Sequence, residues 1–141
     1  MTRLVIDASV LLSAAVAAPD TPLALLMGAV RSGAVEMVVC ERLLGEVRRG
    51  LDSRYFRGRL SDEERKDIPP VLARASLMLP DPVSPAPVLR DPDDDYLLAL
   101  ASTTEAAAIV SGDGDLLEHP DLDPPAITAR EACVRFGLIA R

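Results

Sequence analysis

The chain has 141 residues, of which 49% are apolar and 26% charged, a composition typical of one globular domain. Its net charge of −7 excludes a uniformly basic surface of the kind that coats DNA. Aromatic residues make up only 3%, so the core must be aliphatic, and a platform of rings for stacking nucleic-acid bases is disfavoured. Eight of the fifteen basic residues fall between Arg42 and Lys66, and this clustering is more informative than the total.

The strands and helices expected in the first half of the chain alternate. We predict a strand over 3–6, a helix over 10–17, a helix from the Thr21–Pro22 cap to Gly33, a strand over 37–40 and a helix over 41–51. The Ser61–Glu64 capping box opens another helix, which we expect Pro69 and Pro70 to break before it resumes through Ala75.

The second half continues the alternation after a Pro-rich stretch over 79–92, which we interpret as an ordered connector. A helix over 94–105, strands over 108–111 and 126–128, and a closing helix over 130–138 follow. Short apolar strands between helices predict a single α/β domain over 1–141 with a mostly parallel sheet.

The cysteines and the N-terminus indicate an ordinary cytoplasmic protein. Cys40 and Cys133 are far apart and have no metal-type spacing, so we expect two reduced core thiols. The apolar run after Arg3 loosely resembles a signal peptide, but Asp7 interrupts it. No stretch reaches the ~18 uninterrupted apolar residues of a membrane span.

Two predicted strands end in acidic residues. Asp7 follows the first strand, and Asp113 follows the strand over 108–111, with Asp115 two residues later. In open parallel sheets, functional groups lie just past the carboxyl ends of the strands. Either acid alone is more often a turn or cap residue.

Three consecutive acids, Asp93 to Asp95, lie at the start of the helix over 94–105, more than a helix cap requires. Asp94 is in register with Leu97, Leu98 and Ala101, so we expect it to point along the buried stripe. Asp95 is rotated by about 100°, and we expect it to support the site or face solvent.

Glu46 is a fourth candidate, on the flank of the apolar stripe of its helix. A flanking Glu is usually solvated, and Glu41 is a weaker candidate because it begins the helix. Three or four carboxylates gathered at one site repel each other unless cations neutralise them. Oxygen ligands alone select Mg²⁺ or Mn²⁺, and the single His119 lies in a predicted turn, which disfavours zinc.

The candidate acids lie in four segments, which are Leu4-Val5-Ile6-Asp7-Ala8-Ser9, the strand and helix from Val38 to Val47, Asp91 to Ala101, and Ile109 to Leu117. In this order, the four segments resemble the motifs of PIN-domain proteins, and the resemblance covers most of the chain. Ser9 stands where Asn is commoner, and Ser111 where Thr is common. The pattern is closest to the toxin components of bacterial type II toxin–antitoxin pairs.

The resemblance implies a PIN-like α/β/α sandwich and a ribonuclease dependent on Mg²⁺ or Mn²⁺. Asp7, Glu46, Asp94 and Asp113 are the implied catalytic and metal-binding acids, with Asp115 accessory to the metal. Ser9, Ser111 and Asp95 are the implied supporting residues around them. Candidate contacts to the RNA backbone are Arg48, Arg49, Arg54, Arg57 and Arg59. The alternative interpretation is that these arginines form a solvated helix face.

The implied partners are an RNA substrate, an antitoxin protein and a second copy of the chain. The helical segments over 10–17 and 23–30 are too apolar for the solvent face of a small domain, which favours a homodimer. Two other functions remain open at this point. One is a non-catalytic PIN-like module that binds RNA or protein. The other is a phosphatase with Asp7 as nucleophile, although such enzymes usually carry a second Asp where this chain has Ser9.

Overall fold

The fold is built on one five-stranded parallel sheet. The structure, a computed structural model, describes residues 2–83 and 92–139. The strands, in chain order, are β1 (Arg3–Ile6), β2 (Glu36–Cys40), β3 (Leu77–Leu79), β4 (Ala108–Val110) and β5 (Ala126–Ile127). Their order across the sheet is β3-β2-β1-β4-β5, and every neighbouring pair is parallel. The first strand is therefore the central one.

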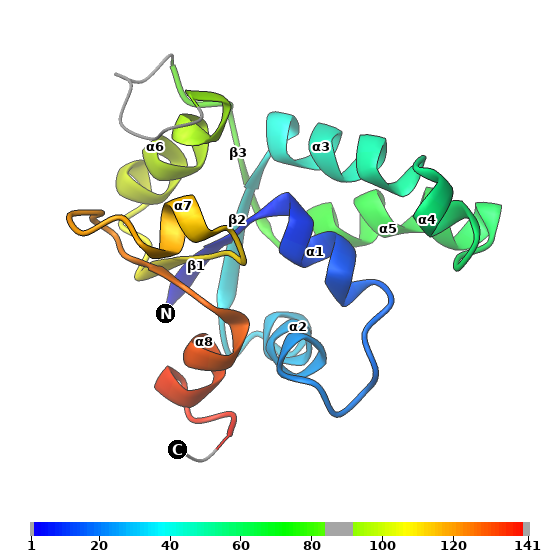
Figure 1. The fold of residues 1–141 in the computed structure, drawn as a ribbon, viewed down its shortest axis with the longest axis horizontal. Helices are drawn as coiled ribbons and strands as arrows, with labels where there is room; N and C mark the ends of the chain where they lie inside the picture. The colour runs from blue at the N-terminus through cyan, green and yellow to red at the C-terminus, as the bar shows by residue number, and fades with distance from the viewer. Residues whose placement is uncertain (1, 84–91, 140–141) are drawn as a thin grey trace.

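Helices cover both faces of this sheet (Figure 1). They are α1 (Ala8–Ala14), α2 (Pro22–Ser32), α3 (Glu41–Leu51), α4 (Arg54–Arg57), α5 (Asp62–Arg74), α6 (Asp95–Thr103), α7 (Gly114–Leu117) and α8 (Ala129–Arg135), with a 3₁₀ turn, η1 (Pro92–Asp94), directly before α6. In Figure 1, α6 lies on one side of the sheet and α1, α3 and α5 lie on the other, while α2 packs against α8. The expected α/β/α sandwich is confirmed.

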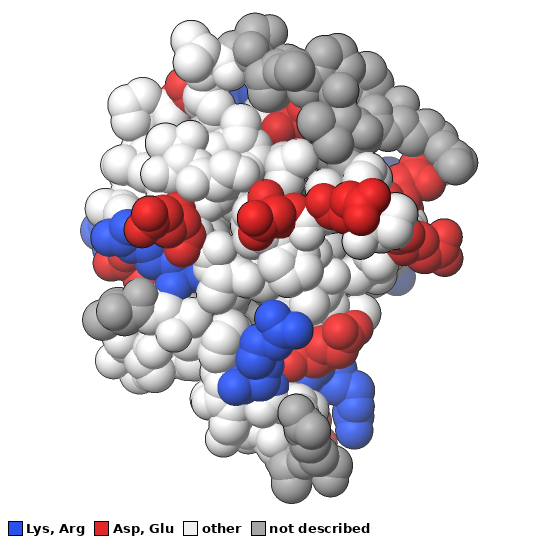
Figure 2. Space-filling model, turned by 90° about the vertical axis from the view of Figure 1, so that its left-hand side faces the viewer, with Lys and Arg blue, Asp and Glu red and all other residues white. Residues whose placement is uncertain are grey.

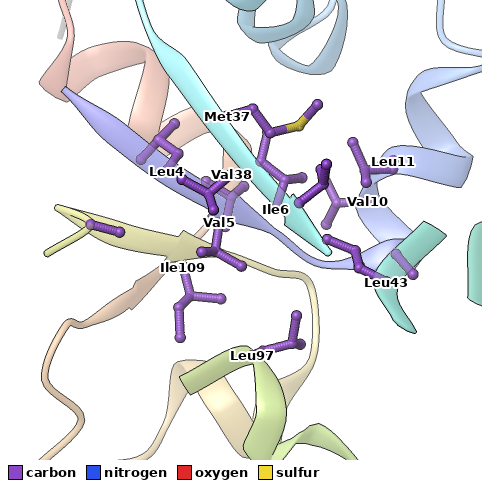
Figure 3. Packing of buried hydrophobic residues seen from close by; sticks show 14 of the residues in the cluster. Leu4, Val5, Ile6, Val10, Leu11, Met37, Val38, Leu43, Leu97 and Ile109 are labelled. Carbon is purple, nitrogen blue, oxygen red and sulfur yellow. The ribbon is translucent and has the colours of Figure 1, made fainter. Parts of the chain in front are cut away.

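The core is aliphatic, as the scarcity of aromatic residues predicts. Leu4, Val5 and Ile6 of the central strand have no exposed surface. Successive side chains of a strand point to opposite faces, and Figure 3 shows Ile6 toward Val10 and Val5 toward Leu97 of α6. One strand thus anchors both helical layers, and its last residue is fixed at the carboxyl edge of the sheet.

Most of the expected elements are present, with shifts of a few residues at their ends. The helix expected over 10–17 is α1, Ala8–Ala14, and the one expected over 94–105 is α6, which begins at Asp95. Three elements were not predicted: β3, which has no fully buried residue, unlike the other strands, and α4 and α7, single-turn helices that are too short to show a helical period.

The expected break at Pro69 and Pro70 is wrong, because α5 runs unbroken from Asp62 to Arg74. Proline removes a helical hydrogen bond and crowds the preceding turn, which normally ends a helix. Here Pro69 and Leu72 are buried, and the Ser61 capping box secures the start of the helix. Packing therefore outweighs local propensity. The connector expected over 79–92 begins after β3, and its residues 84–91 lie outside the described residues.

In the part of the chain that the structure describes, no helix has both the length and the hydrophobicity needed to cross a membrane.

Burial of both cysteines makes their reactivity a test of the packing. Cys40 and Cys133 are free and have no exposed surface. Burial raises the pKa of the Cys40 thiol to about 11 and also raises that of Cys133, so the reactive thiolate is scarce at pH 8. We expect neither thiol to react with Ellman's reagent in the native protein and both to react in urea. Rapid reaction of one thiol without denaturant would contradict this packing.

Candidate active site

Asp7 lies at the carboxyl end of the central strand and begins α1. Its backbone amide donates a hydrogen bond to the Val110 carbonyl at 2.9 Å, which ties it to the neighbouring strand β4. Its Oδ1 accepts a hydrogen bond from the Ser9 amide at 3.0 Å, so the carboxylate also caps α1. Its Oδ2 accepts a hydrogen bond from the Ser111 hydroxyl at 2.8 Å. Both oxygens are therefore held in place by groups from two segments.

Ser111 links two of the predicted acids. It follows β4, has 1% exposed surface, and its hydroxyl accepts a hydrogen bond from the Asp113 amide at 3.0 Å while donating to Asp7. Asp113 in turn caps α7, because its Oδ1 accepts a hydrogen bond from the Asp115 amide at 2.9 Å. Asp115 is exposed. The serine thus sets the position of one acid relative to the other.

A cavity of about 730 Å³ opens at this edge of the sheet. Three of the predicted acids, Asp7, Asp94 and Asp113, line it together with Ser9 and Ser111. These residues come from segments spread over more than a hundred positions. The parallel sheet brings them to one place because its strands all end at the same edge.

Glu46 is half-buried on α3 and does not line this cavity, but it is electrostatically coupled to Asp7. Burial raises the pKa of its carboxyl above the usual range, and the charge of Asp7 raises it further. The Tyr96 hydroxyl and the Arg42 guanidinium act in the opposite direction and lower this pKa, with a smaller lowering effect from Arg49.

Tyr96 and Arg42 belong to the site although the sequence did not single them out for it. Tyr96 has 1% exposed surface, and the Arg42 guanidinium lies 4.4 Å from the centre of its ring. Arg42 also donates a hydrogen bond to the Asp93 carbonyl at 3.0 Å. The pair connects α3 to the start of α6. The sequence signal that could have found Tyr96 is its place directly after the acidic run, since the chain has only two tyrosines.

The expectation that Asp95 leans toward solvent is wrong. Asp95 has only 3% exposed surface, whereas Asp94 is half-buried and lines the cavity. The prediction treated Asp94 and Asp95 as parts of one α-helix and rotated them by about 100° relative to each other. Asp94 instead belongs to the 3₁₀ turn Pro92–Asp94, to which this step does not apply. Both residues take part in polar or electrostatic interactions.

The donor chemistry of these residues suits a hard divalent cation, because every candidate ligand is an oxygen. As the side chains are placed, no three Asp, Glu, His or Cys residues in the described ranges form a group that could hold a metal ion. His119 does not line the cavity, and its Nδ1 accepts a hydrogen bond from the Asp121 amide at 3.3 Å.

The five arginines suggested as RNA contacts lie outside the acidic cavity. Arg48 forms an ion pair with Glu41, and the Arg59 guanidinium lies 3.6 Å from the centre of the Tyr55 ring. Arg54 and Arg57 are on α4, which Figure 1 shows at the end of the molecule opposite α6 and α7.

A comparison with known protein families matches residues 3–115 to the PIN domain. The chain therefore belongs to the PIN domain family, whose fold is generally a nuclease fold. A search of curated proteins finds no match.

The buried hydroxyl of Tyr96 offers a test of the site's internal structure. This hydroxyl acts on the half-buried Glu46 carboxyl and favours its charged form, which lowers the pKa of Glu46. We expect Tyr96→Phe to raise the pKa of Glu46 and to lower the free energy of unfolding at pH 7 by about 1 kcal/mol, measured by urea denaturation without metal. Tyr55→Phe is the control, because Tyr55 is 51% exposed. Unchanged or increased stability in Tyr96→Phe would show that the hydroxyl does not stabilise the charged form of Glu46.

Proposed function

We propose that this protein is a metal-dependent endoribonuclease that hydrolyses phosphodiester bonds of RNA. The observation that carries the proposal is the convergence of Asp7, Asp94 and Asp113 on one cavity, with Glu46 electrostatically coupled to Asp7. Membership of the PIN domain family supports nuclease chemistry. A phosphatase with Asp7 as nucleophile is less well supported, because hydrogen bonds from Ser9 and Ser111 engage both oxygens of Asp7.

Mg²⁺ or Mn²⁺ is the proposed cofactor. Asp7, Asp94, Asp113 and Glu46 would hold it, with Asp115 as an accessory ligand. When bound, such an ion polarises the scissile phosphate and lowers the pKa of the attacking water. It also balances the charge of the gathered acids, which otherwise repel each other.

The chain's own contribution is to hold the carboxylates in fixed orientations. The Ser111 hydroxyl and the Ser9 amide direct the two oxygens of Asp7, and Ser111 also engages the Asp113 amide. Buried Asp95 supports the start of α6 beside Asp94. Groups that are held before the substrate arrives need no reorganisation during the reaction.

We further propose that the ribonuclease is the toxin of a type II toxin–antitoxin pair, acts as a homodimer in the cytoplasm and is held inactive by an antitoxin. An apolar groove between α1, α2 and α5 supports the dimer, since Val71 at its rim is 45% exposed. The free, buried cysteines are consistent with a reducing compartment. The proposed contacts to the RNA backbone lie outside the acidic cavity and are Arg48, Arg49, Arg54, Arg57 and Arg59.

Metal dependence and the role of Asp7 can be tested together. RNA cleavage should require Mg²⁺ or Mn²⁺ and stop in EDTA, and Asp7→Asn should abolish it. Without metal, Asp7→Asn should also raise the unfolding temperature, because it relieves repulsion between carboxylates. Asp121→Asn, an exposed change outside the cavity, is the matched control and should leave both measurements unchanged.

Full activity in chelator would overturn the proposed mechanism. RNA binding without cleavage would favour a non-catalytic module, and cleavage of a small phosphomonoester alone would favour a phosphatase.

Asp94 and Asp95 should have opposite phenotypes. Asp94→Ala removes a half-buried carboxylate of the cavity, so activity should fall by several powers of ten with little change in unfolding temperature. Asp95→Ala removes a buried carboxylate from a residue that takes part in polar or electrostatic interactions, so we expect a loss of about 1–3 kcal/mol in stability while the folded fraction still cleaves RNA. An inactive but stable Asp95→Ala, beside an active Asp94→Ala, would reassign the third acid.

A further inference from the structure

The acidic cavity extends well beyond the carboxylates. Its other half is formed by the starts of two helices that pack against each other, α2 and α8. The lining residues there are Thr21, Pro22, Leu23, Thr128, Ala129 and Arg130, and we refer to this half as the α2–α8 subsite. The family match ends at residue 115, so the contribution of α8 comes from a part of the chain that the family assignment does not cover.

Apart from Arg130, the side chains of this subsite have no hydrogen-bond donor to spare for a ligand, because both threonine hydroxyl protons are already donated within the protein. The Thr21 hydroxyl donates to the Ala18 carbonyl at 2.7 Å and accepts from the Ala24 amide at 3.3 Å. The Thr128 hydroxyl accepts from the Glu131 amide and donates to the Glu131 carboxylate, each at 3.1 Å. The remaining side chains are aliphatic. Such a wall binds a sugar or a base by shape and apolar contact, without reading its sequence.

Arg130 is the exception, and among the residues that line the cavity it is the one with a basic side chain. It is exposed at the first turn of α8, and its neighbour Glu131 is occupied by the capping box with Thr128. Three carboxylates and one cationic group therefore line the same cavity, the carboxylates beside the carboxyl edge of the sheet and Arg130 at the start of α8. On the face of the molecule shown in Figure 2, basic side chains lie below a row of acidic side chains.

This polarity fits a segment of a polyanion better than a small neutral ligand. A cavity of about 730 Å³ is within the usual range for a bound small molecule, roughly 300–1,000 Å³, and so has room for a nucleotide. A phosphate at the acidic end requires a cation between it and the carboxylates, whereas a phosphate at the other end meets a guanidinium directly, a geometry that favours bidentate hydrogen bonds.

We propose that the α2–α8 subsite binds the nucleotide next to the scissile phosphate, with its sugar or base against Pro22, Leu23 and Ala129 and its phosphate on Arg130. This inference rests on the proposed ribonuclease function and adds to it a substrate contact from the C-terminal helix. Arg130 is a substrate-binding residue in this scheme. The chemistry at the scissile bond remains with the acids.

The test compares Arg130→Ala with Arg135→Ala, an exposed arginine of the same helix that does not line this cavity. Cleavage of a single-stranded RNA oligonucleotide with Mg²⁺ should show KM raised roughly 10-fold in Arg130→Ala, with kcat changed much less. Arg135→Ala should match the wild type. Binding of the same oligonucleotide, labelled with fluorescein and measured by anisotropy in EDTA, should weaken in parallel.

Salt dependence separates a phosphate contact from a structural effect. Loss of one phosphate contact should lower the slope of log affinity against log salt concentration by about 0.7 for a single strand, and Arg130→Lys should restore the slope. If the wild type cleaves RNA but Arg130→Ala keeps its KM and salt slope, the subsite is overturned while the proposed function stands. If the wild type binds RNA without cleaving it, the proposed function fails and the anisotropy comparison still decides the role of Arg130. Absence of any RNA binding overturns both.

Discussion

The parallel pairing of β1 with β4 is the constraint on which the site depends. It places Ile6 opposite Val110, so that the next residues of both strands, Asp7 and Ser111, meet at the carboxyl edge of the sheet. The Ser111 hydroxyl then bonds to Asp7 and accepts from the amide of Asp113. A slip of one residue would turn these side chains to the other face and separate the acids.

Gathering acids at one edge has an electrostatic cost, and the fold offsets part of it. Asp7 and Asp113 each cap a helix, so their oxygens accept hydrogen bonds from backbone amides. Glu46, which is partly desolvated, lies close enough to Arg42 and the Tyr96 hydroxyl for both to favour its charged form. The remaining repulsion is what a divalent cation would relieve, and this is the physical link between the shape of the site and the proposed metal dependence.

Much of the fold followed from local patterns in the sequence. The apolar runs at β1, β2, β4 and β5 and the caps at Thr21 and Ser61 lie where they were expected, because burial and capping act over a few neighbouring residues. The edge strand β3 and the continuity of α5 through Pro69 were missed. Both depend on packing against distant segments, and that packing outweighs what the local residues favour.

The sequence by itself determined which acids are candidates, since Asp7, Asp94 and Asp113 follow strands or open a helix in a recognisable order. Only the tertiary structure decided that Asp95 is buried, that Tyr96 and Arg42 stand beside Glu46, and that Arg130 shares a cavity with the acids. The reason is physical. Strand ends and helix starts follow from local periodicity, whereas the distance between α8 and the carboxyl edge of the sheet depends on how α2 and α8 pack, and no local pattern encodes it.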